Sequence, residues 1–307
     1  MSTYSIGVDL GGTNLRAAAM SAEGKILVRV EHPTPDVSSG NAVVQGIVDG
    51  VKAVHTQMGQ QQLVGVGIGV PGFILMEKGI VVGSGNLPGL DNYPIRDEIE
   101  ARLKTSVILE NDANAAALGE YWMGAGRGWH DLILLTLGTG VGGGIVINGQ
   151  ILHGFLGMAG ELGHMTIVPN GYPCGCGGNG CLEKYASATA VSAMAKLLNL
   201  GDLSAKEVFD LAEAGNQRAR VIFESAGTAL GTAIANLTNI FNPPLFLLGG
   251  GMTAGWDLFA PSMLAEAKRR SFTFRSRAPE IKPSALGADS GIFGAAYLPI
   301  GAKPARN

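Results

Sequence analysis

Residues 4–20 read YSIGVDLGGTNLRAAAM, two apolar runs separated by a turn that contains Gly11 and Gly12. Apolar runs on either side of a glycine pair predict two strands joined by a tight turn, here over 4–10 and 15–20. The theme returns about 130 residues later, where an apolar run over 132–137 leads into the glycine-rich stretch 138–144 and a short run over 145–147. Two such units predict a duplicated α/β architecture.

Strands and helices alternate along the rest of the chain. Apolar residues at helical spacing predict a helix over 41–58. Further helices are expected over 94–104, 111–123, 189–198, 204–214, 217–240 and 256–270, with a last one beginning near 291, and further strands over 26–30, 63–70, 107–110 and 245–248. This alternation is typical of the α/β class.

The length of 307 residues exceeds that of a usual single domain and favours two lobes. We expect an N-terminal α/β lobe over 1–120, completed by a C-terminal helix over 291–307. The second α/β lobe is expected over 121–290 and contains the cysteine-rich loop 164–183.

The composition bounds the class of protein. Hydrophobic residues make up 46% of the chain, enough for a sizeable core, so disorder is excluded. The 47 glycines are about twice the usual share, which indicates tight turns or backbone brought close to ligands.

The charge pattern argues against two kinds of partner. With 22 basic and 25 acidic residues the net charge is −3, and no basic stripe suited to nucleic acid is present. The most apolar stretch, 226–248, is interrupted by polar residues and by Pro243 and Pro244, so we expect no membrane span. The N-terminal residues lack the pattern of a signal peptide, and we therefore expect a cytoplasmic protein.

Three glycine turns follow predicted strands and could cradle phosphates, because backbone N–H groups approach a phosphate best where no Cβ obstructs them. A single glycine pair is more often only a hairpin turn, but three of them favour a nucleotide site. Neither a Walker A loop nor the dinucleotide fingerprint fits the turns. The candidate nucleotide residues are Asp9, Gly11, Gly12, Thr13, Asn14, Gly138, Thr139, Gly140, Gly249, Gly250 and Gly251. Asp9 could orient a water molecule of bound Mg²⁺.

The three cysteines of the chain lie within eight positions, at Cys174, Cys176 and Cys181, and His164 precedes them. One imidazole and three thiolates form a complete tetrahedral zinc shell, and a closed shell of this kind is structural. The alternative is three buried thiols beside a hydrogen-bonded histidine. Because the set is odd and crowded, metal binding is favoured over a disulfide framework.

The run Glu110-Asn111-Asp112 lies where a predicted strand meets a predicted helix. Taken alone, Asn111 or Asp112 could simply cap the helix. Beside a phosphate cradle, a carboxylate at a strand end is also what phosphoryl transfer needs to accept the proton of an attacking hydroxyl.

These motifs together resemble the ROK family of bacterial sugar kinases and repressors. The resemblance covers nearly the whole chain and is carried by residues 9–13, 70–72, 110–114, 137–144, 160–164 and 174–183. It implies an actin-like ATPase/sugar kinase (ribonuclease H-like) fold, with a nucleotide and sugar cleft between two lobes and ATP with Mg²⁺ as the donor. Asn14 departs from the family pattern, in which many relatives have lysine.

The resemblance also implies roles for individual residues. Asp112 would be the catalytic base, and His164 would use one ring nitrogen for zinc and the other for a sugar hydroxyl. Sugar contacts would come from Gly72, Asn86, Asn111, Asp112, Glu161, His164 and Glu183. Outside this resemblance, Asn86 could be only a turn residue and Glu183 only a surface charge.

The resemblance favours a glucokinase, which makes glucose 6-phosphate from ATP and glucose, present as a homodimer or homotetramer. A kinase for N-acetylmannosamine, N-acetylglucosamine or fructose is the main alternative. A sugar-sensing repressor is disfavoured because only eight residues precede Asp9, too few for a helix-turn-helix domain. A non-catalytic binding module is disfavoured because Asp112 is present.

Overall fold

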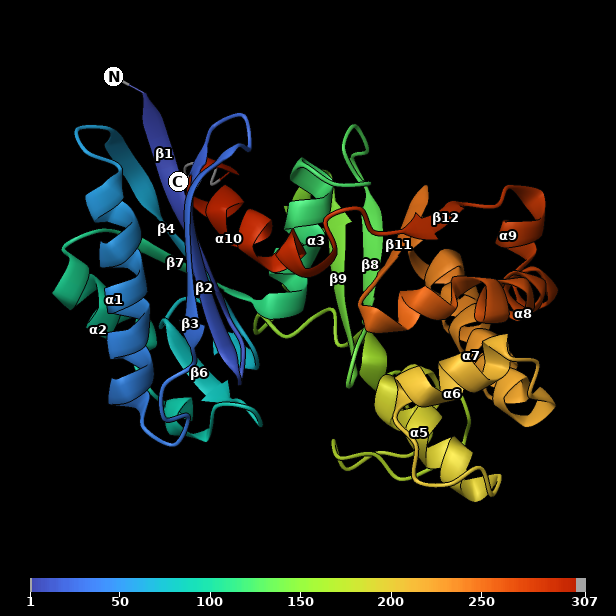
Figure 1. The fold of residues 1–307 in the computed structure, drawn as a ribbon. Coiled ribbons are helices and arrows are strands. Elements are labelled where there is room, and N and C mark those ends of the chain that lie inside the picture. The colour runs from blue at the N-terminus through green and yellow to red at the C-terminus, as the bar shows by residue number, and fades with distance from the viewer. Residues whose placement is uncertain (1, 302–307) are drawn as a thin grey trace. The chain divides into compact units, whose positions relative to one another are not determined.

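The computed structural model describes residues 2–301 (Figure 1). By their contacts these residues form two compact units. The first comprises residues 2–130, 144–160 and 285–301, and the second comprises residues 131–143 and 161–284. The lobe boundaries expected from the sequence, 1–120 with 291–307 and 121–290, stay a prediction. Residues 302–307 of the expected last helix lie outside the described residues.

The first unit is built on a five-stranded sheet of order β3-β2-β1-β4-β7. The antiparallel strands β1 (Thr3–Leu10), β2 (Asn14–Ser21) and β3 (Ile26–Pro33) follow the predicted strand and glycine-turn pattern. Strands β4 (Gln62–Val70) and β7 (Val107–Asn111) run parallel to β1. A hairpin of β5 (Phe73–Leu75) and β6 (Ile80–Gly83), followed by a short 3-10 helix at Pro88–Leu90, was not anticipated from the sequence.

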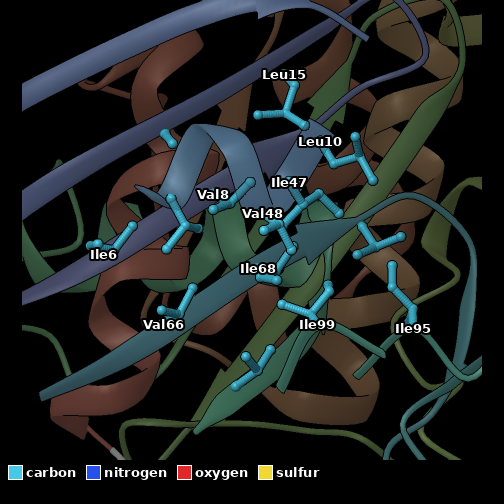
Figure 2. Packing of buried hydrophobic residues seen from close by; sticks show 14 of the residues in the cluster. Ile6, Val8, Leu10, Leu15, Ile47, Val48, Val66, Ile68, Ile95 and Ile99 are labelled. Atoms are coloured by element: carbon cyan, nitrogen blue, oxygen red, sulfur yellow. The ribbon is translucent and has the colours of Figure 1, made fainter. Parts of the chain in front are cut away.

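One face of this sheet packs against α1 (Gly40–Gln57) and α2 (Ile95–Leu103). Alternate residues of β1, namely Ile6, Val8 and Leu10, are fully buried in an apolar cluster with residues of both helices (Figure 2). Every second residue of β1 and residues at helical spacing along α1 therefore pack in one core. The helical spacing of α1 is the part of this packing that the sequence predicted.

The opposite face carries α10 (Ser290–Gly301) and α3 (Asp112–Trp122), which also pack against each other. Glycines make this approach possible. A Cβ on Gly67 would lie 1.9 Å from the carbonyl oxygen of Ala295, and one on Gly294 would lie 1.6 Å from that of Ala115. Part of the glycine excess therefore serves close packing of helices, in addition to the turns that the sequence indicated.

The second sheet has the order β10-β9-β8-β11-β12. Within the second unit, β8 (Leu132–Leu137), β11 (Leu245–Gly249) and β12 (Glu280–Pro283) are parallel. Strand β9 (Val141–Ile147) begins four residues earlier than expected and is followed by β10 (Gln150–Ile151). Gly143 is a strand residue and not part of the turn. A Cβ there would lie 2.6 Å from Leu162 Cδ1, which explains why this strand position is a glycine.

The remaining helices of the second unit are α4 (Glu183–Ala186), α5 (Ala188–Leu197), α6 (Ala205–Glu213), α7 (Gln217–Phe241), α8 (Trp256–Arg270) and α9 (Phe272–Ser276). The sequence predicted α5, α6, α7 and α8 but not the short helices α4 and α9. Ser204 and Glu207 form a capping box at the start of α6, which explains its sharp beginning. Within residues 2–301, no helix is both long enough and apolar enough to cross a membrane.

The close approach of α10 to the first sheet predicts a strong effect of Gly67→Ala. The added methyl group has no room beside Ala295, so helix and strand have to separate. We expect a loss of about 1–3 kcal/mol or more in the free energy of unfolding, measured by urea denaturation. Gly83→Ala is the matched control, because a Cβ on that strand glycine meets nothing within 4 Å. Equal stability of the two variants would contradict this packing.

Candidate active site and metal centre

Three of the predicted site residues of the first unit lie at one edge of its sheet. Strands β1, β4 and β7 are parallel, and their register pairs Asp9 with Gly69 and Gly69 with Glu110. Parallel strands present their carboxyl ends at the same edge, where α/β proteins bind ligands. Asp9, Asn111 and Asp112 are thereby brought together from three parts of the sequence.

Asn111 is the N-cap of α3. Its Oδ1 accepts hydrogen bonds from the backbone N–H groups of Ala113 at 2.9 Å and Asn114 at 3.1 Å. Its Nδ2 donates to the carbonyl oxygen of Gly72 at 3.2 Å. The capping role that the sequence left open therefore falls on Asn111, and its side chain also connects the segment after β4 to the start of α3.

Asp112 occupies the first position of α3, and its Oδ1 accepts the Ala113 N–H at 2.8 Å. Burial raises the pKa of Asp112 above that of an ordinary aspartate; the Ala113 hydrogen bond opposes this shift, and the negative charge of Asp9 adds to it. A raised pKa makes the carboxylate a stronger base. Activity that depends on the ionised form should therefore fall, as the pH drops, at a higher pH than for an ordinary aspartate.

The first glycine turn closes with a hydrogen bond from the Gly11 N–H to the Asn14 carbonyl at 2.9 Å. Gly12, Thr13 and Asn14 are exposed, and exposed Asn86 lies beside the turn, since a Cβ on Gly12 would be 3.5 Å from Asn86 Cβ. The first unit thus brings the predicted sugar residue Asn86 next to the predicted phosphate turn.

Asp9 is not free at the strand end. Its carboxylate forms an ion pair with Arg16 of β2, a partner that the sequence did not suggest. Burial raises the pKa of Asp9, and the charge of Arg16 opposes this shift.

The second unit brings the other two glycine turns together. Strands β8 and β11 are parallel and pair Thr136 with Gly249, so the turn 138–140 and the turn 249–251 emerge at one edge. Gly250 has a φ of +90°, and a Cβ on it would lie 2.4 Å from the Leu137 carbonyl oxygen. Only glycine fits this junction. A Cβ at Gly138 or Gly251, by contrast, meets nothing within 4 Å, so these turns leave open space for a ligand.

Glu183 begins α4 immediately after the cysteine-rich loop. Its Oε2 accepts the N–H of Val141 at 3.1 Å, and a Cβ on Gly140 would lie 2.3 Å from the same oxygen. The predicted sugar residue Glu183 therefore lies directly against the glycine turn 138–140. Thr189 of α5 supports the same turn by donating to the Thr139 carbonyl at 2.7 Å.

The side chains of His164, Cys174, Cys176 and Cys181 converge, with their potential ligand atoms all within 4.8 Å of one another. Cys176 Sγ lies 3.6 Å from Cys181 Sγ, and Cys174 Sγ lies 3.6 Å from His164 Nδ1. Burial, followed by the neighbouring sulfur atoms, raises the pKa of Cys181 to about 12. Thiolates so close together repel one another, and a bound cation removes this repulsion. The set of one imidazole and three thiolates matches that of structural zinc.

The two ring nitrogens of His164 face different groups. Nδ1 points to the sulfur cluster, while Nε2 lies 4.0 Å from Glu161 Oε2. The proposed division of the ring, with one nitrogen for the metal and one for a sugar hydroxyl, is thus compatible with this geometry, and its role in binding stays a prediction. A bound metal would fix the ring and, through it, the environment of Glu161.

Two residues at the first site were not assigned a role from the sequence. Glu110 is buried one position before Asn111, and its Oε2 lies 2.7 Å from Nε2 of His153. Glu110 could have been suspected, because a charged residue closes an apolar strand. His153 carries no sequence signal, since it comes from a segment that is remote in the chain.

Comparison with known proteins identifies the family of the chain. The ROK family model matches residues 5–301. A glucokinase of Thermotoga maritima is 41% identical over 310 residues, covering 95% of this chain and 96% of the relative. A glucokinase of Halalkalibacterium halodurans is 39% identical over 310 residues, covering 95% and 94%. An N-acetyl-D-glucosamine kinase of Haemophilus influenzae is 34% identical over 303 residues, covering 95% and 98%.

Two solved structures are similar over nearly their whole length. A ROK hexokinase from Thermus thermophilus has a TM-score of 0.89 at 34% identity, covering 97% of this chain and 99% of the other. A ROK family glucokinase from Streptomyces griseus in complex with glucose and AMPPNP has a TM-score of 0.79 at 34% identity, covering 97% and 100%. The fold is accordingly that of the actin-like ATPase and sugar kinase class. Within this class, the chain belongs to the ROK family.

The cysteine cluster predicts one zinc ion per chain in metal analysis of the purified protein. Removing the metal with a chelator, or replacing Cys176 by serine, should loosen the loop 164–183 and raise the KM for sugar by about 10-fold or more. Re-addition of zinc should restore the chelated wild type but not the serine variant. A metal-free protein with unchanged KM and unchanged thermal stability would contradict a structural role of the metal.

Proposed function

We propose that this chain is an ATP-dependent glucokinase, which transfers the γ-phosphoryl group of ATP to O6 of glucose. The observation that carries the proposal is the carboxylate of Asp112, with its raised pKa, at the sheet edge that also bears the first glycine turn. The similarity of the chain to two glucokinases, at 39–41% identity over 95% of the chain, supports glucose as the acceptor.

Asp112 accepts the proton of the sugar hydroxyl as that oxygen attacks the phosphoryl group. The Ala113 hydrogen bond fixes the position of this carboxylate, and the Asn111 cap fixes the turn that carries it. Positioning and charge stabilisation account for most of the catalysis in phosphoryl transfer. The groups that we propose for sugar binding are Gly72, Asn86, Asn111, Asp112, Glu161, His164 and Glu183.

Nucleotide binding falls to the glycine turns. The glycine turns at 11–14, 138–140 and 249–251, which include the exposed residues Gly12, Thr139 and Gly250, suit phosphate oxygens and the adenosine moiety. ATP binds with Mg²⁺, for which the carboxylate of Asp9 is the proposed partner through a water molecule. The closed Cys₃His shell binds zinc and has no catalytic role, because no ligand position stays open.

A second candidate function is phosphorylation of another hexose. The similarity to an N-acetyl-D-glucosamine kinase, at 34% identity, favours N-acetylglucosamine as an alternative acceptor, and N-acetylmannosamine and fructose are further options. The family resemblance also supports a cytoplasmic location and a homodimeric or homotetrameric state. Sedimentation of the purified protein tests the oligomeric state.

The direct test is ADP release by the purified protein with glucose, mannose, fructose, N-acetylglucosamine and N-acetylmannosamine. We expect the highest kcat/KM with glucose and identification of the product as glucose 6-phosphate. A preference for an N-acetylated sugar would overturn the choice of glucose. No activity with any of these sugars would overturn the kinase assignment.

Asp112→Asn is the matched variant in the same assay. It should lower kcat by about 10²–10⁴-fold with little change in glucose affinity, because the amide keeps the shape but cannot accept the proton. Its free energy of unfolding should not fall, since burial disfavours the charge that the substitution removes. Near-normal turnover would contradict the role of Asp112 as base.

A further inference from the structure

Glu110 is a buried carboxylate that the proposed reaction does not use. Its side chain is 3% exposed, and it is the penultimate residue of β7, one position before Asn111. Its Oε1 accepts the backbone N–H of Asn111 at 3.0 Å and the side-chain amide of Asn114 at 3.0 Å. One oxygen therefore fastens the backbone that enters the catalytic turn and the first turn of the helix that leaves it.

The other oxygen of Glu110 binds a histidine from a distant segment. Oε2 lies 2.7 Å from Nε2 of His153, which follows β10. The hydrogen bond to Glu110 raises the pKa of His153, burial opposes this shift, and the negative charge of Glu110 adds to it. The pair is thus favoured in the form of imidazolium and carboxylate, and each charge compensates the other. A buried carboxylate without such a partner is strongly disfavoured.

The pair lies at the wall of a cavity of about 920 Å³ within the first unit. The other charged side chains of this wall are Glu77, Lys78 and Arg96. Arg96 is held by the carbonyl oxygens of Met76 and Glu77, at 3.0 and 3.1 Å. Within the described residues, the cation that is hydrogen-bonded to Glu110 is therefore His153, whose side chain is 41% exposed and can exchange protons with solvent.

We infer that Glu110 is a positioning residue for Asp112, and that His153 supplies its counter-charge. The inference rests on the proposed function, in which Asp112 is the base. Glu110 acts through the backbone of Asn111 and the side chain of Asn114, so its loss would let the turn shift without removing any group that contacts substrate. Displacement of a catalytic group by about 1 Å can cost about 10²-fold in rate.

Two substitutions separate hydrogen bonding from charge at position 110. Glu110→Ala removes both hydrogen bonds to the turn and should lower kcat about 10-fold or more, with the KM values for sugar and ATP within about threefold of wild type. Glu110→Gln keeps an oxygen for Asn111 and Asn114 and can donate to neutral His153. It should therefore retain kcat within about threefold of wild type.

His153→Gln leaves the Glu110 carboxylate without its counter-charge. A buried carboxylate without a counter-charge is strongly disfavoured, so the midpoint of urea denaturation at neutral pH should fall in this variant. The double variant Glu110→Gln with His153→Gln removes the uncompensated charge and should recover most of that loss. His130→Gln, at an exposed histidine of the same unit, is the matched control and should leave the midpoint unchanged.

The deciding experiment measures kcat, KM and the denaturation midpoint of these variants, together with amide hydrogen exchange at Asn111. Faster exchange in Glu110→Ala is expected even if the sugar kinase activity of the wild type proves absent, so failure of the proposed function is distinguishable from failure of this inference. If Glu110→Ala does not fold, Glu110→Gln and His153→Gln decide. Unchanged exchange, an unchanged kcat in Glu110→Ala, equal changes in kcat and KM, or an unchanged denaturation midpoint in His153→Gln would each overturn the inference.

Discussion

The close approach of two helices to one face of the first sheet is the constraint on which the candidate active site depends. Gly65, Gly67 and Gly69 of β4 lie on that face, and a Cβ on them would come within 1.9–3.3 Å of residues in α10 or α3. Above Gly69 the nearest groups are Ala115 and the backbone of Asp112. The glycines therefore set how deeply α3 lies on the sheet, and so place Asp112 at a buried strand end where its pKa is raised.

A bound metal would have the corresponding organising role in the second unit. The loop 164–183 contributes few buried apolar side chains, so hydrophobic packing alone fixes it weakly. Three sulfur atoms and one imidazole nitrogen converge instead, and the two ends of the loop carry His164 and Glu183. Because Glu183 also binds the N–H of Val141, the metal-organised loop and the glycine turn 138–140 support each other. A structural ion can thereby influence substrate affinity without taking part in the chemistry.

The features that were predicted correctly are those whose cause is local in the sequence. The glycine turn after β1, the helix α1 and the convergence of His164 with the three cysteines all follow from spacing within about 20 residues. The assigned roles of the site residues stay predictions. What the sequence could not supply depends on tertiary packing. The glycines of β4 beneath α10 and the pair of Glu110 with His153 join segments far apart in the chain, and the ion pair of Asp9 with Arg16 depends on the register between β1 and β2. The start of β9 was misplaced because glycines normally indicate a turn, whereas Gly143 is required by Leu162.

The central claim is that packing against the sheet turns Asp112 into a base. Carbon NMR titration of the aspartate carboxyl groups in the folded protein, with the Asp112 signal assigned by its loss in Asp112→Asn, measures this directly. The account predicts a pKa above the ordinary value of 3.8, because burial and the charge of Asp9 both disfavour ionisation. A pKa at or below 3.8 would contradict it.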